Sequence, residues 1–186
     1  MRIKLCQSAR PSGLLAGAAT AALLLCGGCT AIDQPVASPA AQAVAPEPLR
    51  KQAEAAYERN RQALLSREPA ALLALRTEDF HVVTPDGVTH DAREMTLFTH
   101  NLLSNVESWE ALSFDIENLE QEGNDVRADV RQHSIRMMRR PDGKVQRVEN
   151  WVTQRETWVQ TAEGWKMRRV DNIRDQRVLI DGVPRT

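Results

Sequence analysis

The segment VQRVENWVTQRETWVQTAEGWKMRRVDNI, residues 145–173, decides the fold of this chain. It consists of strand-like runs rich in Val, Thr and Trp, and residues two apart in such a run share one face of a β-strand. The pair Glu163-Gly164 indicates a turn between two such runs, while Pro141-Asp142-Gly143-Lys144, just before the segment, is a strong hairpin signal. The segment therefore predicts two long antiparallel strands, one from Val145 to about Gln160 and a last one through Trp165 and Ile173.

The upstream strands are predicted by alternation of apolar and polar residues. A long alternating run begins at Val126 and continues towards Arg140, and another follows Trp109. The sequence Glu-Gly-Asn at residues 122–124 marks the turn between these two runs. A shorter strand is expected at residues 80–83, and the chain after Trp109 reads as an antiparallel meander.

Before this meander, apolar residues recur every three or four positions, which predicts helices. A second helix begins at Pro69 and ends near Thr77, and a third follows Asp91, which forms a capping-box pattern with Glu94. Three helices ahead of a meander imply a segregated α+β fold with the sheet curled over the helices. The buried stripe of the first helix is expected at Leu49, Ala53, Ala56, Tyr57, Asn60 and Leu64.

Four short pieces, in this order and spacing, resemble the nuclear transport factor 2-like superfamily, within its SnoaL-like branch. They are Tyr57 to Leu65, Ala70 to Phe80, Pro85-Asp86-Gly87, and Arg155-Glu156-Thr157-Trp158 followed by Glu163-Gly164-Trp165-Lys166. The resemblance implies a cone: three N-terminal helices packed in a strongly curved antiparallel sheet, a cystatin-like roll with a pocket. It implies no particular reaction, because the superfamily contains both enzymes and proteins without known chemistry.

Candidate catalytic residues are few. In members that move protons, such as ketosteroid isomerase, an aspartate base stands directly before a proline. The resemblance matches that position to Thr84, before Pro85, and a threonine cannot act as the base. Tyr57 matches a helix-one tyrosine that polarises a carbonyl in such enzymes, or is simply a core aromatic. His133 and Asp171 are the remaining candidates, although alternation from Val126 places His133 on the solvent side of its strand unless a bulge intervenes.

Polar residues mixed with tryptophan on the long strands are candidates for ligand binding. The proposed set is Tyr57, Glu149, Trp151, Arg155 and Trp158. Alternation separates Glu149, Trp151 and Arg155 from Trp158, and one of the two faces is expected to line the concave side. The alternative for the charged members is pairing across strands. No histidine or carboxylate spacing indicates a metal site, and no cofactor motif occurs.

Residues 1–28 have the three parts of a secretory signal: basic Arg2, Lys4 and Arg10, an apolar run, and small residues before Cys29. Leu25 to Cys29 resembles a bacterial lipobox, which predicts lipidation of Cys29; the alternative is an ordinary cleaved signal. Residues 29–47 read as an Ala/Pro-rich tether and residues 48–186 as the domain. The expected location is the cell envelope, with the protein anchored in a membrane and facing the periplasm, in the outer membrane if the host has one; otherwise it is secreted.

Charge and cysteine content restrict the partners. All three cysteines lie at or before position 29, so the domain cannot form an internal disulfide. Between residues 125 and 177 there are 13 Lys and Arg against 8 Asp and Glu. This excess predicts an anionic partner at the arginine-bearing face, or merely a solvated sheet. Nucleic acid is not expected, and a homodimer stays open.

Two functions remain from the sequence. The first is an envelope-tethered, non-catalytic domain that binds a small molecule or partner protein in its pocket or on its sheet face. The second is a cofactor-independent acid–base enzyme, an isomerase or cyclase, acting on a small hydrophobic substrate. A titratable side chain deep in the pocket would favour the enzyme.

Overall fold

The computed structural model describes residues 46–185. The signal sequence, Cys29 and all but the last two residues of the expected tether lie outside the described residues. Glu47, the last of these, already belongs to the first helix. The elements follow in the order α1 (Glu47–Ser66), α2 (Pro69–Leu73), β1 (Arg76–Val83), β2 (Thr89–His90), α3 (Ala92–Asn105), β3 (Val106–Glu122), β4 (Asp125–Arg139), β5 (Val145–Thr161), β6 (Gly164–Ile180) and β7 (Val183–Arg185).

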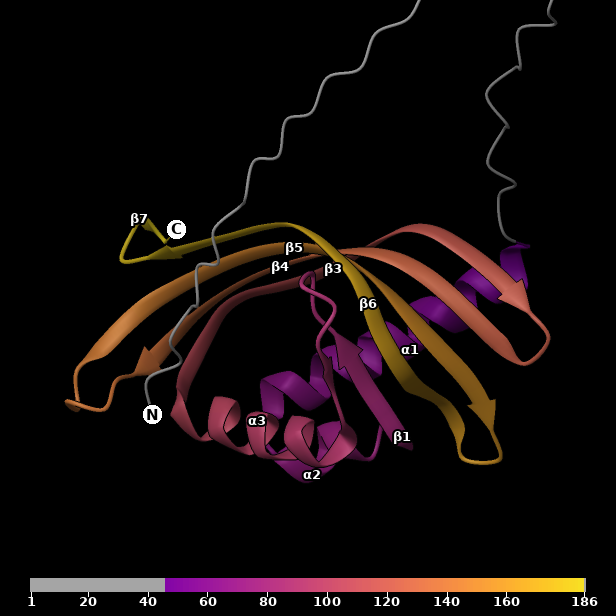
Figure 1. Cartoon of the computed structure of the whole chain (residues 1–186), viewed down its shortest axis with the longest axis horizontal. Coiled ribbons are helices and arrows are strands. Elements are labelled where there is room, and N and C mark those ends of the chain that lie inside the picture. The colour runs from indigo at the N-terminus through magenta and orange to yellow at the C-terminus, as the bar shows by residue number, and fades with distance from the viewer. Residues whose placement is uncertain (1–45, 186) are drawn as a thin grey trace, which may run out of the picture. The chain divides into compact units, whose positions relative to one another are not determined.

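The strands form one strongly curved sheet that arches over the helices (Figure 1). Its order is β2-β1-β6-β5-β4-β3, with β7 paired to the end of β6. The α+β class and the curved sheet over three N-terminal helices are therefore confirmed. The four long strands are antiparallel neighbours, as the hairpin signals predict.

The sheet is mixed rather than wholly antiparallel, because β1 pairs with β6 in parallel. Short turns force antiparallel pairing only between strands that they connect. β1 and β6 are separated in sequence by β2, α3 and three long strands, so no turn sets their relative direction. The local turn pattern could not reveal this pair.

Helix boundaries follow local signals. The Asp91 side chain accepts a hydrogen bond from the Glu94 backbone at 2.9 Å, and the Glu94 carboxylate accepts one from the Asp91 backbone, completing the predicted capping box. The second helix is shorter than expected and ends at Leu73, because the chain already enters β1 at Arg76. Val106, expected in the third helix, instead begins β3.

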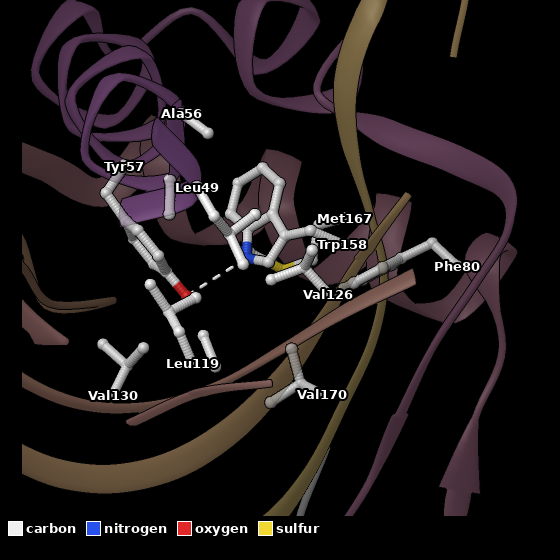
Figure 2. Packing of buried hydrophobic residues seen from close by; sticks show 12 residues of the cluster. Leu49, Ala56, Tyr57, Phe80, Leu119, Val126, Val130, Trp158, Met167 and Val170 are labelled. Atoms are coloured by element: carbon white, nitrogen blue, oxygen red, sulfur yellow. Dashed lines mark hydrogen bonds between the residues drawn. The ribbon is translucent and has the colours of Figure 1, made fainter. Parts of the chain in front are cut away.

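The core lies between α1 and the concave face of the sheet (Figure 2). The expected α1 stripe is buried in full, and Trp158 meets it from β5 with 2% of its surface exposed. The Tyr57 and Trp158 rings contact edge to face, with centroids 5.3 Å apart. Val126, Ala128 and Val130 of β4 line this face, so even-numbered residues of β4 point inward there. We call the opposite face of the sheet its outer face.

Candidate functional site

A cavity of about 570 Å³ lies between the helices and the concave face of the sheet. This volume falls within the usual range for small-molecule pockets. Phe98 of α3 lines the cavity and is 56% exposed, so the cavity reaches the surface beside this helix. The walls are predominantly apolar and include Leu64, Leu72, Phe80, Phe114, Val152 and Val170.

Glu156 of β5 is the most deeply buried acid on the cavity wall, with 1% of its surface exposed. The Tyr57 hydroxyl donates to Glu156 Oε2 at 2.8 Å, and Trp158 Nε1 approaches the same oxygen at 3.2 Å. Gln154 Nε2 donates to Oε1 at 2.6 Å. Burial raises the pKa of the Glu156 carboxyl, while the three donors oppose that rise. One end of the cavity thus holds a buried acid whose two oxygens are both hydrogen-bonded.

The same burial acts on Tyr57. Desolvation, and then the charge of Glu156, raise the pKa of the Tyr57 hydroxyl well above its ordinary value. This hydroxyl therefore stays protonated at neutral pH and acts as a donor to Glu156 rather than as a base.

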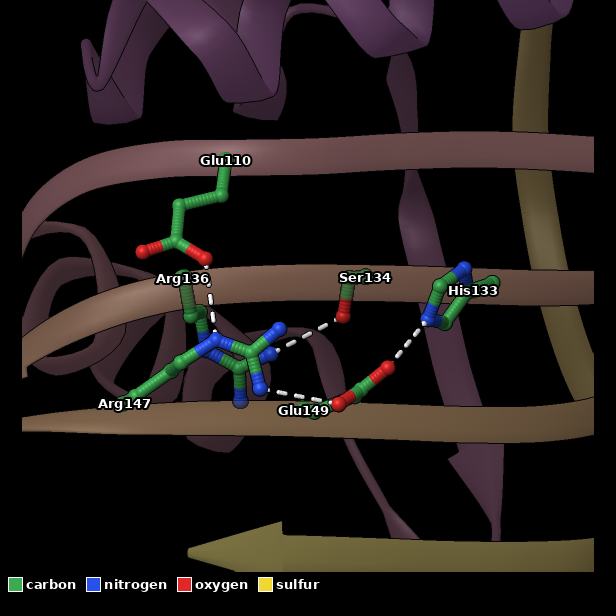
Figure 3. A network of polar contacts seen from close by, with 6 residues as sticks. All are labelled: Glu110, His133, Ser134, Arg136, Arg147 and Glu149. Atoms are coloured by element: carbon green, nitrogen blue, oxygen red, sulfur yellow. Dashed lines mark hydrogen bonds and ion pairs between the residues drawn. The ribbon is translucent and has the colours of Figure 1, made fainter. Parts of the chain in front are cut away.

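Two arginines also line the cavity. Arg76 of β1 lies over the Phe80 ring, 4.4 Å from its centroid, and donates to Thr99 Oγ1 at 2.8 Å. Burial lowers the pKa of Arg76 to about 10, and the nearby charge of Glu156 opposes this shift. Arg136 of β4 lies over the Trp109 ring, 5.8 Å from its centroid. It donates to Ser134 Oγ at 3.1 Å (Figure 3). Burial lowers the pKa of Arg136 as well.

Of the residues predicted from sequence, Tyr57 and Trp158 lie together inside, in the core beside Glu156. Glu156 itself lines the cavity, whereas neither Tyr57 nor Trp158 does. These two side chains therefore hold the acid in place and do not themselves form the described cavity wall.

His133, Glu149 and Trp151 lie together on the outer face. His133 Nε2 is 3.0 Å from Glu149 Oε1, and Arg147 donates to Glu149 and to Glu110, each at 2.9 Å (Figure 3). The His133 and Trp151 rings stack, with centroids 4.8 Å apart. The contact with Arg147, and then that with His133, lowers the pKa of Glu149. None of these residues lines the cavity, although Glu149 and Trp151 belong to the proposed ligand set.

Arg155 and Asp171 form a separate outer group. Arg155 donates to both carboxylate oxygens of Asp129 at 3.0 Å, and Asp171 lies 2.6 Å from Arg169. Asp171 faces Arg155 across the β5–β6 pair, whereas His133 faces Trp151. Four positions of β5 separate these pairs, roughly 13 Å along the strand. The two catalytic candidates, His133 and Asp171, are thus not brought together.

The sequence reasoning did not single out Glu156, Arg76 or Arg136. A glutamate beside Arg155 reads as a cross-strand ion pair, and nothing local distinguishes an inward from an outward arginine. Alternation from Trp158 was the one available signal, since it places Glu156 on the face of that large apolar residue.

Within residues 46–185, no group of three or more His, Cys, Asp or Glu side chains is arranged to hold a metal ion. No helix of this described part is long and apolar enough to cross a membrane.

No protein-family model and no curated protein matches this chain. Solved structures resemble it at low identity. An NTF2-like protein from Cytophaga hutchinsonii is 12% identical with a TM-score of 0.52, covering 66% of this chain and 94% of its own. A ketosteroid isomerase-like protein from Erwinia carotovora atroseptica is 15% identical with a TM-score of 0.51, covering 65% and 92%. A type 2 hexachlorocyclohexane dehydrochlorinase is 13% identical with a TM-score of 0.54, covering 71% and 89%.

Proposed function

Starting from the fold that residues 46–185 share with nuclear transport factor 2-like proteins, we propose that the cavity of this chain binds a small, largely apolar molecule without transforming it. We further assign the chain to the SnoaL-like branch of that superfamily, on the sequence pieces described above. The observation that carries the binding proposal is the cavity of about 570 Å³, with apolar walls and polar side chains near both ends. Apolar walls supply affinity, and a few placed polar groups supply orientation.

The entrance offers a matched pair of variants. Phe98 and Leu97 are neighbours on α3 with 56% and 58% of their surfaces exposed, but only Phe98 lines the cavity. The neutral apolar fluorophore N-phenyl-1-naphthylamine should bind the full chain, and Phe98→Ala should weaken it about fivefold, from partial loss of an aromatic contact. Leu97→Ala should leave the affinity unchanged. No saturable binding, or equal loss in both variants, would contradict the proposal.

An acid–base enzyme is the second candidate, and Glu156 is the observation that favours it. A carboxyl with a raised pKa on an apolar cavity wall is a common arrangement in proton transfer. Against this, both of its oxygens already accept hydrogen bonds from Tyr57, Trp158 and Gln154. Turnover of a small apolar ketone or lactone that Glu156→Gln abolishes, with binding retained, would establish the enzyme and overturn the binder.

We also propose that the domain is tethered in the cell envelope through lipid on Cys29, on the strength of the signal-like residues 1–28. A lipid-bearing terminus with two acyl chains would hold the protein stably at a membrane. Cys29→Ala should release the protein into a soluble envelope fraction or leave it unprocessed, whereas Cys26→Ala should not. A mature N-terminus other than Cys29, by mass spectrometry, would rule the anchor out.

A further inference from the structure

The two arginines of the cavity differ in how their charges are compensated. Neither forms an ion pair with a carboxylate among the described residues, but Arg76 experiences the charge of Glu156. For Arg136, desolvation alone accounts for the lowered pKa. A half-buried cation without an opposite charge is costly, because it has given up water without gaining a partner. Arg136 is therefore the cation whose environment is incomplete.

The guanidinium of Arg136 has unused donors. Its Nε donates to Met138 Sδ at 3.2 Å and its Nη1 donates to Ser134 Oγ at 3.1 Å. Both acceptors are neutral, and a guanidinium carries five N–H groups in a planar fork. Nη2 makes no hydrogen bond within residues 46–185, so at least two N–H groups remain for another acceptor. The Trp109 ring holds the guanidinium in place at 5.8 Å.

Other polar atoms near Arg136 lack partners. Trp109 faces Arg136 across the β3–β4 pair, and Asn150 lies diagonally from it on β5. Both side chains line the cavity, yet Trp109 Nε1 and Asn150 Oδ1 are buried without a hydrogen bond to any described residue. Buried polar groups are normally paired, so this end of the cavity has hydrogen-bonding capacity that the protein does not fill.

The opposite end of the cavity already holds both charges, because Glu156 lies there and Arg76 experiences its charge. Glu156 and Asn150 are six positions apart on β5, roughly 20 Å along the strand. A ligand anion would be repelled by Glu156 when that carboxyl is ionised and attracted by Arg136. The cavity thus has a polarity that would orient an elongated ligand.

Resting on the proposed binding function, we infer that the ligand is an elongated apolar carboxylate whose head group is held by Arg136, with its chain along the apolar walls towards Glu156. A carboxylate fits the planar fork of arginine in two parallel hydrogen bonds, which a neutral hydroxyl cannot reproduce. The negative charge of the ligand carboxylate would compensate the Arg136 cation, and the apolar chain of the ligand would pack against the apolar cavity walls.

The test compares decanoate with 1-decanol, two probes of equal chain length, by calorimetric titration of the full chain below the micelle concentration. Decanoate should bind the wild type at least about tenfold more tightly, as expected for a charge-assisted hydrogen bond. Arg136→Met keeps the packing on Trp109 but removes the fork, and should bind both probes with nearly equal affinity. Its unchanged affinity for decanol would show that it folds.

Arg131→Met is the matched control, because Arg131 lies on the same strand but on the outer face, paired with Asp115 and Glu117. It should keep the full preference for decanoate. Equal binding of both probes to the wild type, or an equal loss of preference in both variants, would overturn the head-group assignment while leaving the binding function intact. Failure of both probes and of the neutral fluorophore would overturn the binding function as well.

Discussion

The inner and outer faces of one strand place the same kind of residue in opposite surroundings. Glu156 points inward on β5 and is almost fully buried, and this burial raises its pKa although three neutral donors oppose the rise. Glu149, an odd number of residues away, points outward, pairs with Arg147 and His133, and has a lowered pKa. On the outer face, Glu149 pairs with basic side chains of the protein. On the inner face, Glu156 and Arg136 form no ion pair with another described residue. A ligand gains the most binding free energy where charged and hydrogen-bonding groups of the protein lack partners.

The largest expected difference between the faces concerns their tryptophans. Trp158→Ala should lower the free energy of unfolding by about 3–5 kcal/mol, because it empties a buried aromatic site. Trp151→Ala on the outer face should cost about 1 kcal/mol, chiefly its stacking on His133. Urea unfolding followed by circular dichroism measures both. Equal losses would mean that the two faces are not as distinct as the burial indicates.

The two glutamates should give the next largest effect and opposite dependences on pH. Glu156→Gln should cost about 1–3 kcal/mol near pH 4, because both carboxyl oxygens accept hydrogen bonds and the amide nitrogen of glutamine cannot. Glu149→Gln should cost less than Glu156→Gln, since its ion pairs are partly solvated. Unfolding free energies of both variants and the wild type, measured from about pH 2 to about pH 8, give the comparison.

The direction in which stability changes with pH follows from the direction of each pKa shift. The folded-state pKa of Glu156 is raised, so its contribution to stability is greatest below its unfolded pKa of about 4.3 and is lost as the pH rises through the folded value. The folded-state pKa of Glu149 is lowered, so its contribution is present above about 4.3 and is lost as the pH falls through the folded value. Parallel curves for the two variants would contradict the assigned environments.

A smaller effect should come from the hydroxyl of Tyr57. Tyr57→Phe keeps the ring contact with Trp158 and removes one donor from Glu156, which retains two others. The expected loss of unfolding free energy is about 0.5–1.5 kcal/mol. The same substitution should also shift the titration of Glu156 upward, which carboxyl-labelled NMR would detect. An unshifted titration would show that Tyr57 does not hold this carboxyl.

The sequence could predict the order and type of the elements because hydrophobic period and turn chemistry are local. The capping box at Asp91 and the hairpin signals at Pro141 and Glu163 are examples. Alternation also divides β5 into two sets, but it does not say which set meets the helices. The proposed ligand set therefore mixed Trp158 from inside with Trp151 from outside.

The cavity itself could not be predicted from local pattern. Its polar residues come from separate strands, Arg76 from β1, Arg136 from β4 and Glu156 from β5. The three residues line one cavity because the sheet is curved and because β1 pairs with β6 in parallel. Neither feature can be predicted from the sequence around these residues. Buried charge is also rare enough that each of these residues reads more simply as a solvated strand residue.

The most direct test of the account is an NMR titration of the four tryptophan indole N–H signals with 1-decanol. Trp109 lines the cavity and Trp151 lies on the outer face of the same sheet. Signals are assigned with Trp109→Phe and Trp151→Phe. The account predicts a saturable shift of the Trp109 signal while the Trp151 signal stays in place. A shift at Trp151 with Trp109 unmoved would show that the ligand binds the outer face and would contradict the central claim.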